Sequence, residues 1–228
     1  MSESLLRKVA FAPYALFLRK IVNTLFHIDW YYHMPKMGFL GVGTIQNPMD
    51  MWVKQEILFD VKPDVVIECG THRGGTALYY ATLMAAFNPE GRIITIDIEN
   101  KVQKAGEYEV FRKYCQRIMG DSTSAAVVSQ VAAQTRGKKV LVILDSLHTK
   151  DHVLKEMELY GRLVSPGSYL IVEDTDINGH PVMPNYGPGP HEAVVEYQKN
   201  HPGEFVIDKS REKMGFTCFP DGFLKRVK

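Results

Sequence analysis

Acidic side chains and a histidine follow two apolar runs in the second half of the chain. Asp145 ends the run KVLVILD, His148 comes three residues later, and the run SYLIVED ends in the adjacent pair Glu173 and Asp174. Like charges this close destabilise one another unless water, hydrogen-bond donors or a cation offsets them. A solvated acidic loop is one interpretation. A divalent-cation site is the other, because Mg²⁺ takes carboxylate oxygens and water as ligands.

The spacing also indicates acid–base chemistry. His148 lies close enough to Asp145 in sequence to reach a hydroxyl group held at the same place, and its neutral imidazole accepts a proton near neutral pH. The alternative is a histidine that caps or packs the loop. Lys150 is a weaker candidate, and Asp176 is interpreted as loop surface.

These side chains need strands that end together. From about residue 48 the sequence alternates helical patterns with short apolar runs, of which 63–68, 92–97, 114–121, 139–145 and 168–174 are predicted strands. Such alternation is typical of a mostly parallel sheet with helices on both faces. If the fourth and fifth strands are neighbours, their ends lie about 5 Å apart. Asp145, Glu173 and Asp174 are then the predicted metal ligands. Trp52, Ile57 and Leu58 are expected to face inward from a helix that begins at Pro48.

The first strand ends in a glycine-rich segment, ECGTHRGG, which contains Glu68, Gly70, Thr71 and Gly75. Glycines after a strand let the backbone pass close to a ligand, and ligands of such sheets bind beyond the carboxyl ends of the strands. The spacing is not the dinucleotide pattern GxGxxG, and no phosphate-binding lysine follows. It fits a loop for an amino-acid carboxylate and a ribose, although an ordinary strand–turn–helix also uses glycine.

The next two strand ends carry acceptors for the same ligand. Asp97 is placed to accept hydrogen bonds from ribose hydroxyls. In the third segment, Gly120, Asp121 and Ser122 follow the strand, and Asp121 either accepts from an adenine amino group or caps the next helix. A pocket for adenosine that lacks phosphate-binding residues indicates S-adenosylmethionine as cofactor.

A long glycine- and proline-rich loop follows the acidic pair and contains His180, Tyr186 and His191. A loop of this length beside a site often serves as a lid or substrate wall. We expect Tyr186 to line the site and His191 to begin the next helix after Pro190. A zinc site from His180, His191 and Glu173 lacks compact ligand spacing.

Bulk properties narrow the class of protein. The chain has 228 residues and a formal net charge of +1, which gives no indication of a nucleic-acid surface. Cys69, Cys115 and Cys218 form no disulfide pattern, which favours a reducing compartment, the cytoplasm. We expect Cys69 and Cys115 to be buried.

Residues 1–36 form an apolar and basic arm, in which Leu16, Phe17, Ile21 and Leu25 suggest a helical stripe. Three alternatives are open: packing on the core or on a second subunit, contact with a membrane surface, or a tail without function. The first favours a homo-oligomer, and the second would place the protein at the periphery of a membrane.

Residues 37–228 resemble the cephalosporin hydroxylase/rhamnosyl O-methyltransferase family. The resemblance rests on the segment from MGFLGVGTIQNP to ECGTHRGGTALYYA, on VILDSLHTKDHVLKEMELYGRLVSPGSYLIVEDT, on YGPGPHEAV and on the terminal GFLKRVK. It implies a Rossmann-like class I methyltransferase fold with seven strands, dependence on S-adenosylmethionine and Mg²⁺, and a tendency to assemble.

The resemblance also implies roles for particular residues. Similar macrolide sugar methyltransferases use Asp-x-x-His as ligand and base, which falls on Asp145 and His148, and a Glu-Asp ligand pair, which falls on Glu173 and Asp174. The first-strand loop falls on residues 68–75, where Cys69 departs from the usual small residue. The cofactor-binding set is then Glu68, Gly70, Thr71, Gly75, Asp97, Gly120, Asp121, Ser122 and Asp145.

The expected activity is O-methylation of a hydroxylated small molecule, a sugar or another natural product. Two alternatives are an iron-dependent hydroxylase or its partner subunit, and a non-catalytic adenosine-binding scaffold. An iron oxygenase favours two histidines and one carboxylate, whereas this sequence offers mainly carboxylates.

Overall fold

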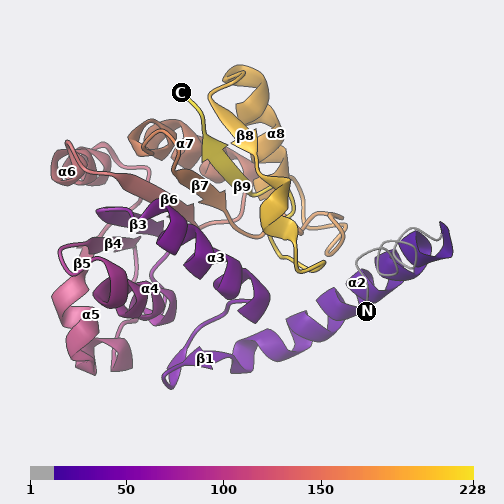
Figure 1. The fold of residues 1–228 in the computed structure, drawn as a ribbon, viewed down its shortest axis with the longest axis horizontal. Coiled ribbons are helices and arrows are strands. Elements are labelled where there is room, and N and C mark those ends of the chain that lie inside the picture. Colours follow the sequence, from indigo (N-terminus) through magenta and orange to yellow (C-terminus); the bar gives the residue numbers. More distant parts are fainter. Residues whose placement is uncertain (1–12) are drawn as a thin grey trace.

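The computed structural model describes the backbone of residues 13–228, together with the side chains of Leu18 and residues 21–228. Leu16 and Phe17 of the predicted apolar stripe therefore lie outside the described side chains. Helix α2 (Pro13–His33) extends away from the body of the molecule, which its C-terminal end joins (Figure 1). A short hairpin, β1 (Gly38–Phe39) and β2 (Val42–Gly43), follows it.

The core is a seven-stranded sheet with the order β5-β4-β3-β6-β7-β9-β8. The first five strands of this order are parallel, and β9 runs antiparallel to β7 and β8. The prediction of a seven-stranded, mostly parallel sheet is confirmed. In chain order the strands are β3 (Val65–Cys69), β4 (Arg92–Asp97), β5 (Cys115–Met119), β6 (Val140–Leu144), β7 (Tyr169–Val172), β8 (Phe205–Ile207) and β9 (Phe223–Arg226).

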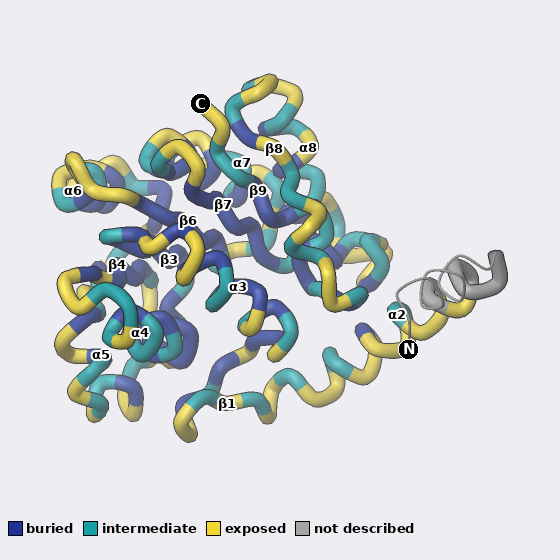
Figure 2. Tube along the Cα trace, viewed as in Figure 1, coloured by how far each residue is buried: buried dark blue, intermediate teal, exposed yellow. Residues whose placement is uncertain are grey.

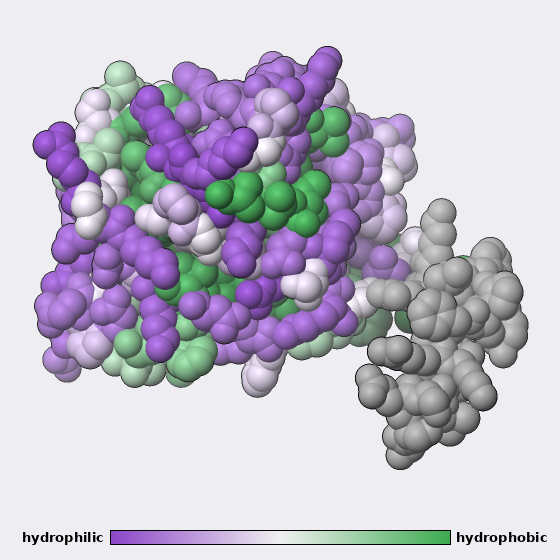
Figure 3. Space-filling model, turned by 45° about the horizontal axis from the view of Figure 1, so that its top comes forward, coloured by the Kyte–Doolittle hydropathy of each residue, from purple (hydrophilic) through white to green (hydrophobic). Residues whose placement is uncertain are grey.

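Helices cover the sheet. They are α3 (Pro48–Val61), α4 (Gly75–Phe87), α5 (Glu109–Tyr114), α6 (Ala125–Thr135), α7 (Lys150–Tyr160) and α8 (Pro190–Asn200). The central strands β3 and β6 are buried at every residue, as expected for a sheet covered on both faces (Figure 2). Two clusters of apolar side chains, one per face, form the core. On the face shown in Figure 3, hydrophilic side chains dominate and apolar ones form separate patches.

One expectation for α3 is wrong. Ile57 and Leu58 are buried, but Trp52 is 58% exposed and its indole donates a hydrogen bond to Glu56 on the next turn. The buried face of α3 instead passes through Val53 and Lys54.

Helix α8 begins at Pro190, so His191 lies in its first turn as predicted. All three cysteines are free, with Cys69 buried and Cys115 partly buried. No helix in the part of the chain that the structure describes has both the length and the apolarity needed to cross a membrane.

Candidate active site

A cavity of about 380 Å³ opens where strands β3, β6 and β7 end. Its walls come from segments that are far apart in the sequence: the end of α2, the segment between β2 and α3, the glycine-rich loop, and the loops after β6 and β7. The predicted site residues that line it are Gly70, Thr71, Gly75, Asp145, His148 and Asp174. Carboxyl ends of parallel strands meet at one edge of a sheet, which is why these residues converge.

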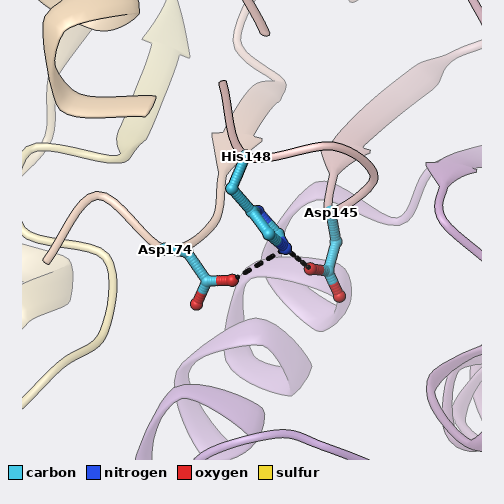
Figure 4. A group of neighbouring side chains, drawn as sticks. All are labelled: Asp145, His148 and Asp174. Atoms are coloured by element: carbon cyan, nitrogen blue, oxygen red, sulfur yellow. Dashed lines mark ion pairs between the residues drawn. The ribbon is translucent and has the colours of Figure 1, made fainter. Parts of the chain in front are cut away.

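Asp145, His148 and Asp174 form a compact cluster (Figure 4). His148 Nε2 lies 3.2 Å from an oxygen of Asp174 and 4.0 Å from an oxygen of Asp145. One donor atom from each residue lies within 4.8 Å of the others, and no other group of three such ligands occurs among the described residues. Asp174 has a positive φ of 54°, so the chain turns sharply here and directs its carboxylate towards His148.

Glu173, the third predicted ligand, is held by partners on the other side. Its carboxylate pairs with Lys54 Nζ at 2.8 Å and accepts from Gln46 Nε2 at 2.5 Å. The same amide nitrogen lies 3.0 Å from an oxygen of Asp145, so Gln46 bridges the two acids. The amide of Glu173 still bonds to Leu144 as a continuation of the sheet. The role of Glu173 as a metal ligand stays a prediction.

The charged side chains at this edge of the sheet are compatible with a bound divalent cation. Asp145, Glu173 and Asp174 provide three carboxylates, and the buried ammonium of Lys54 offsets one of them. Burial, followed by repulsion from Glu173 and Asp174, raises the pKa of Asp145 well above its usual range. A cation bound between the acids would relieve that repulsion, and oxygen donors suit Mg²⁺. The donor set therefore fits the predicted metal.

The glycine-rich loop after β3 depends on its glycines for close approach. Gly70 has a φ of 101°, and a Cβ there would lie 1.8 Å from the carbonyl oxygen of Asp145. Asp97, at the end of the next strand, fixes the conformation of this loop. One of its oxygens accepts hydrogen bonds from the amides of Thr71 and His72 at 3.1 and 2.7 Å.

The remaining predicted cofactor residues do not line this cavity. Glu68 is buried behind the loop, accepts from the Thr95 hydroxyl at 2.6 Å, and has its pKa raised by burial to about 7. Asp121 accepts from the amide and hydroxyl of Thr123, which is the capping alternative. Gly120, directly after β5, has a φ of 153°, and Ser122 is buried two residues later. Their contacts with a cofactor stay predictions.

A buried acid that the sequence analysis missed connects two of these loops. Glu156 of α7 is fully buried, and one of its oxygens accepts from Ser122 at 2.5 Å and from Ser146 at 2.7 Å. Ser122 follows β5 and Ser146 follows β6. Glu156 therefore fixes the loop after β5 relative to the loop that carries Asp145 and His148.

The interpretation of Asp176 as loop surface is wrong. Its side chain is fully buried, and Tyr31 of α2 donates to it. Burial raises the pKa of Asp176 to about 8. The side chain turns inward because α2 covers it, and nothing in the local sequence indicates a partner 145 positions away.

Side chains of the long loop after β7 lie in two different environments. Tyr186 lines the cavity as predicted. His180 instead pairs with Glu192 at 2.9 Å, and its ring lies 3.8 Å from that of His191. Glu173 pairs with Lys54 and does not form a ligand cluster with these histidines. The described residues therefore give no support to the zinc alternative.

Lys54 and Gln46 are functional candidates that sequence reasoning did not identify. Lys54 had a signal: it shares the apolar face of α3 with Val53, Ile57 and Leu58, and a lysine there needs a buried partner. Gln46 had none, because a glutamine in a connecting segment does not indicate which acid it will reach.

Comparison with known proteins gives a consistent picture. The family model described as rhamnosyl O-methyltransferase/CmcI matches residues 31–227. A rhamnosyl O-methyltransferase of Mycobacterium tuberculosis (strain H37Rv) is 38% identical over 202 residues, which cover 86% of this chain and 82% of the relative. One of Mycobacterium leprae is 36% identical over 203 residues, with 86% and 87% covered.

Solved structures agree in fold. A structure of CmcI with Mg and S-adenosylmethionine superimposes with a TM-score of 0.67 at 18% identity, covering 85% of this chain and 78% of the other. CalS11, a TDP-rhamnose 3'-O-methyltransferase of calicheamicin biosynthesis, gives 0.53 at 15% identity, with 86% and 90% covered. At these identities the likeness concerns the fold.

Proposed function

Because the chain belongs to the rhamnosyl O-methyltransferase/CmcI family, we propose that it transfers the methyl group of S-adenosylmethionine to a hydroxyl of a sugar, with Mg²⁺ at the acidic cluster. One observation carries the proposal. The Asp145–His148–Asp174 cluster and the glycine-rich loop line the same cavity, so a metal-bound acceptor and a methyl donor would meet there. Holding two reactants in contact supplies much of the rate enhancement, because the methyl donor is already activated.

Asp145 and Asp174, with Glu173 beside them, are the residues we assign to the metal. Bound Mg²⁺ would supply a Lewis acid that lowers the pKa of the acceptor hydroxyl. His148 is the base that takes the hydroxyl proton on Nε2. Asp174 lies 3.2 Å from that nitrogen and would stabilise the ring once Nε2 carries the proton.

The cofactor is assigned to the adjoining end of the cavity. Gly70, Thr71 and Gly75 supply backbone that a ligand can approach closely. Asp97 and Asp121, at the ends of the next two strands, are assigned to the ribose and adenine sides, and Gly120 and Ser122, on either side of Asp121, are assigned to the adenine side with it. Glu68 supports the loop from behind through Thr95.

The iron-dependent alternative lacks its ligands. A facial iron site takes two histidines and one carboxylate, whereas the cluster found among the described residues has one histidine and two carboxylates.

Calorimetric titration with S-adenosylhomocysteine, with and without Mg²⁺, tests the proposal. Saturable binding in both conditions places the adenosine pocket here, and separate titration with Mg²⁺ should detect one metal site. An Asp145→Asn variant should lose the Mg²⁺ heat and keep most of the S-adenosylhomocysteine binding. Absence of S-adenosylhomocysteine binding by the wild-type protein in both conditions would refute the methyltransferase proposal.

The arm offers a surface for a second copy of the chain. Leu18, Ile21, Leu25 and Ile28 of α2 are between 40 and 60% exposed. Their spacing alternates three and four residues, which is the seam that another helix fills, and this supports a homo-oligomer over a membrane contact. Light scattering after chromatography should show an oligomer that Leu25→Glu dissociates. A monomeric wild type that binds vesicles would favour the membrane alternative.

A further inference from the structure

Helix α2 is anchored to the body only near its C-terminal end, within the described residues (Figure 1). His27 is buried there, with Nε2 3.2 Å from the carbonyl oxygen of Thr217 and its ring 4.2 Å from that of Phe216. His27 therefore fixes the backbone of the last turns of α2 against the body, although the side chains of Leu25 and Ile28 are 60% exposed. This anchoring directs one face of the last turns of α2 at the cavity.

That face reaches the catalytic cluster. Trp30, Tyr31 and Met34 line the same cavity as Asp145, His148 and Asp174. Trp30 and Tyr31 belong to the last turn of α2, and Met34 begins the short 3-10 helix Met34–Lys36 that follows it. Further apolar and aromatic walls come from Ile177, Met183, Tyr186 and Phe219. This part of the cavity is thus apolar, whereas the glycine-rich loop lies at the cofactor end.

The same turn of α2 is tied to the loop that carries Asp174. The Tyr31 hydroxyl lies 3.3 Å from both oxygens of Asp176, and His27 Nε2 lies 3.5 Å from that carboxylate. Asp176 is fully buried and stands two residues after Asp174, whose φ is positive. A left-handed residue persists only when its surroundings hold it. Without the Tyr31 hydroxyl, a buried carboxylate would lose a donor directly beside this strained turn.

We propose that the end of α2 and the 3-10 turn after it are a functional part of the site: Trp30, Tyr31 and Met34 form a wall of the acceptor subsite, and Tyr31 holds the Asp174 loop through Asp176. This inference rests on the proposed function and deepens it. The subsite takes a hydroxyl compound with an apolar group beside the reacting hydroxyl, such as the methyl group of a 6-deoxy sugar. Tyr31 and Asp176 are positioning residues, because they act on the metal through Asp174.

The first test is Tyr31→Phe, with Tyr32→Phe as matched control. Tyr32 is the next residue on the same helix and is 75% exposed. For Tyr31→Phe we expect the Mg²⁺ dissociation constant to rise about 3–10-fold, as for loss of an ordinary hydrogen bond, with S-adenosylhomocysteine binding unchanged. Tyr32→Phe should match the wild type in both. Equal Mg²⁺ affinity in the two variants would overturn the positioning role. If the wild type binds no S-adenosylhomocysteine, the proposed function fails separately.

The second test uses the two tryptophans of the chain, Trp30 and Trp52. Trp52→Phe leaves Trp30 as the only indole, and Trp30→Phe leaves the exposed Trp52. Mn²⁺ titrated in place of Mg²⁺ should quench Trp30 saturably and leave Trp52 nearly unaffected. Quenching that does not distinguish the two variants, while Mn²⁺ binding is confirmed by calorimetry, would overturn the placement of Trp30 at the site.

Acceptor selectivity provides the third test. Trp30→Ala should raise KM for a methyl α-L-rhamnoside more than for the corresponding L-mannoside, which carries a hydroxyl where the rhamnoside has only its methyl group. The KM for S-adenosylmethionine should stay the same. An equal change for the two sugars would show that Trp30 does not contact the apolar group.

Discussion

Lys54 Nζ lies 2.8 Å from a carboxylate oxygen of Glu173, and neither side chain is more than 1% exposed. Gln46 completes the arrangement, because its amide oxygen accepts from Lys54 at 2.6 Å and its amide nitrogen donates to Glu173. A buried ion pair of this kind persists only when its remaining donors and acceptors are satisfied. It fixes Glu173 beside Asp145 and sets the charge that the proposed metal would balance.

Removal of the Lys54 ammonium should leave an unpaired buried acid. Lys54→Met is expected to lower the free energy of unfolding by about 3–5 kcal/mol without Mg²⁺. The double variant Lys54→Met/Glu173→Gln should recover much of this loss, because the uncompensated charge is gone. Urea unfolding of the wild type, the single variant and the double variant measures these free energies of unfolding. A single variant within about 1 kcal/mol of the wild type would contradict a structural role for the pair.

His148 is expected to act as the base. His148→Gln should lower kcat by about 10²–10⁴-fold, because the group that takes the proton from the sugar hydroxyl is then missing. Binding of S-adenosylhomocysteine should not change. The matched control is His180→Gln, since His180 pairs with Glu192 outside the catalytic cavity. Steady-state kinetics of both variants decide it, and comparable kcat values would rule out His148 as base.

Glu156 is expected to act on the cofactor through the two loops that it connects. Glu156→Gln should weaken binding of S-adenosylhomocysteine about 5–10-fold, because the hydrogen bonds that Ser122 and Ser146 donate to the carboxylate are replaced by weaker ones to an amide oxygen. Mg²⁺ affinity should change less. The control is Glu158→Gln: Glu158 lies on the same helix as Glu156, is exposed, and pairs with His201 beyond the end of α8. Calorimetry that gives the same affinity for both variants would refute this role.

Glu68 should make stability depend on pH. Its pKa rises from 4.5 to about 7 on folding, mainly through burial. The protonated form is therefore favoured in the folded state, and its contribution is fully present below pH 4.5 and is lost as the pH rises to about 7.

The Glu68→Gln variant tests this directly. Relative to the variant, wild-type protein should lose about 3 kcal/mol of unfolding free energy between pH 4.5 and 7. Urea unfolding without Mg²⁺ at several pH values measures the difference. A difference that stays constant over this range would mean that Glu68 titrates normally.

The sheet and the centre of the site could be predicted because they follow from local patterns. Apolar runs gave the strands, and parallel strands place their carboxyl ends at one edge, which brought Asp145, His148 and Asp174 together. The divergence of Glu173 from Asp174 could not be predicted. It depends on where the strand ends: Glu173 still bonds to Leu144, and the left-handed turn begins one residue later.

Partners from distant segments were also beyond prediction. Asp176 is buried by Tyr31, and Asp145 is bridged to Glu173 by Gln46, across separations of 99 or more residues. Such contacts depend on how α2 and the segment before α3 pack on the finished sheet. The lysine on the apolar face of α3 was the one signal in the sequence that pointed to an unusual buried charge.

Methyl transfer itself tests the central claim most directly. Wild-type protein, S-adenosylmethionine and an L-rhamnoside are incubated with Mg²⁺ or with a chelator, and the products are analysed by mass spectrometry. Our account predicts a sugar heavier by one methylene unit, formed only with Mg²⁺ and lost in the Asp145→Asn variant. Equal product formation in the presence of the chelator, or by that variant, would contradict it.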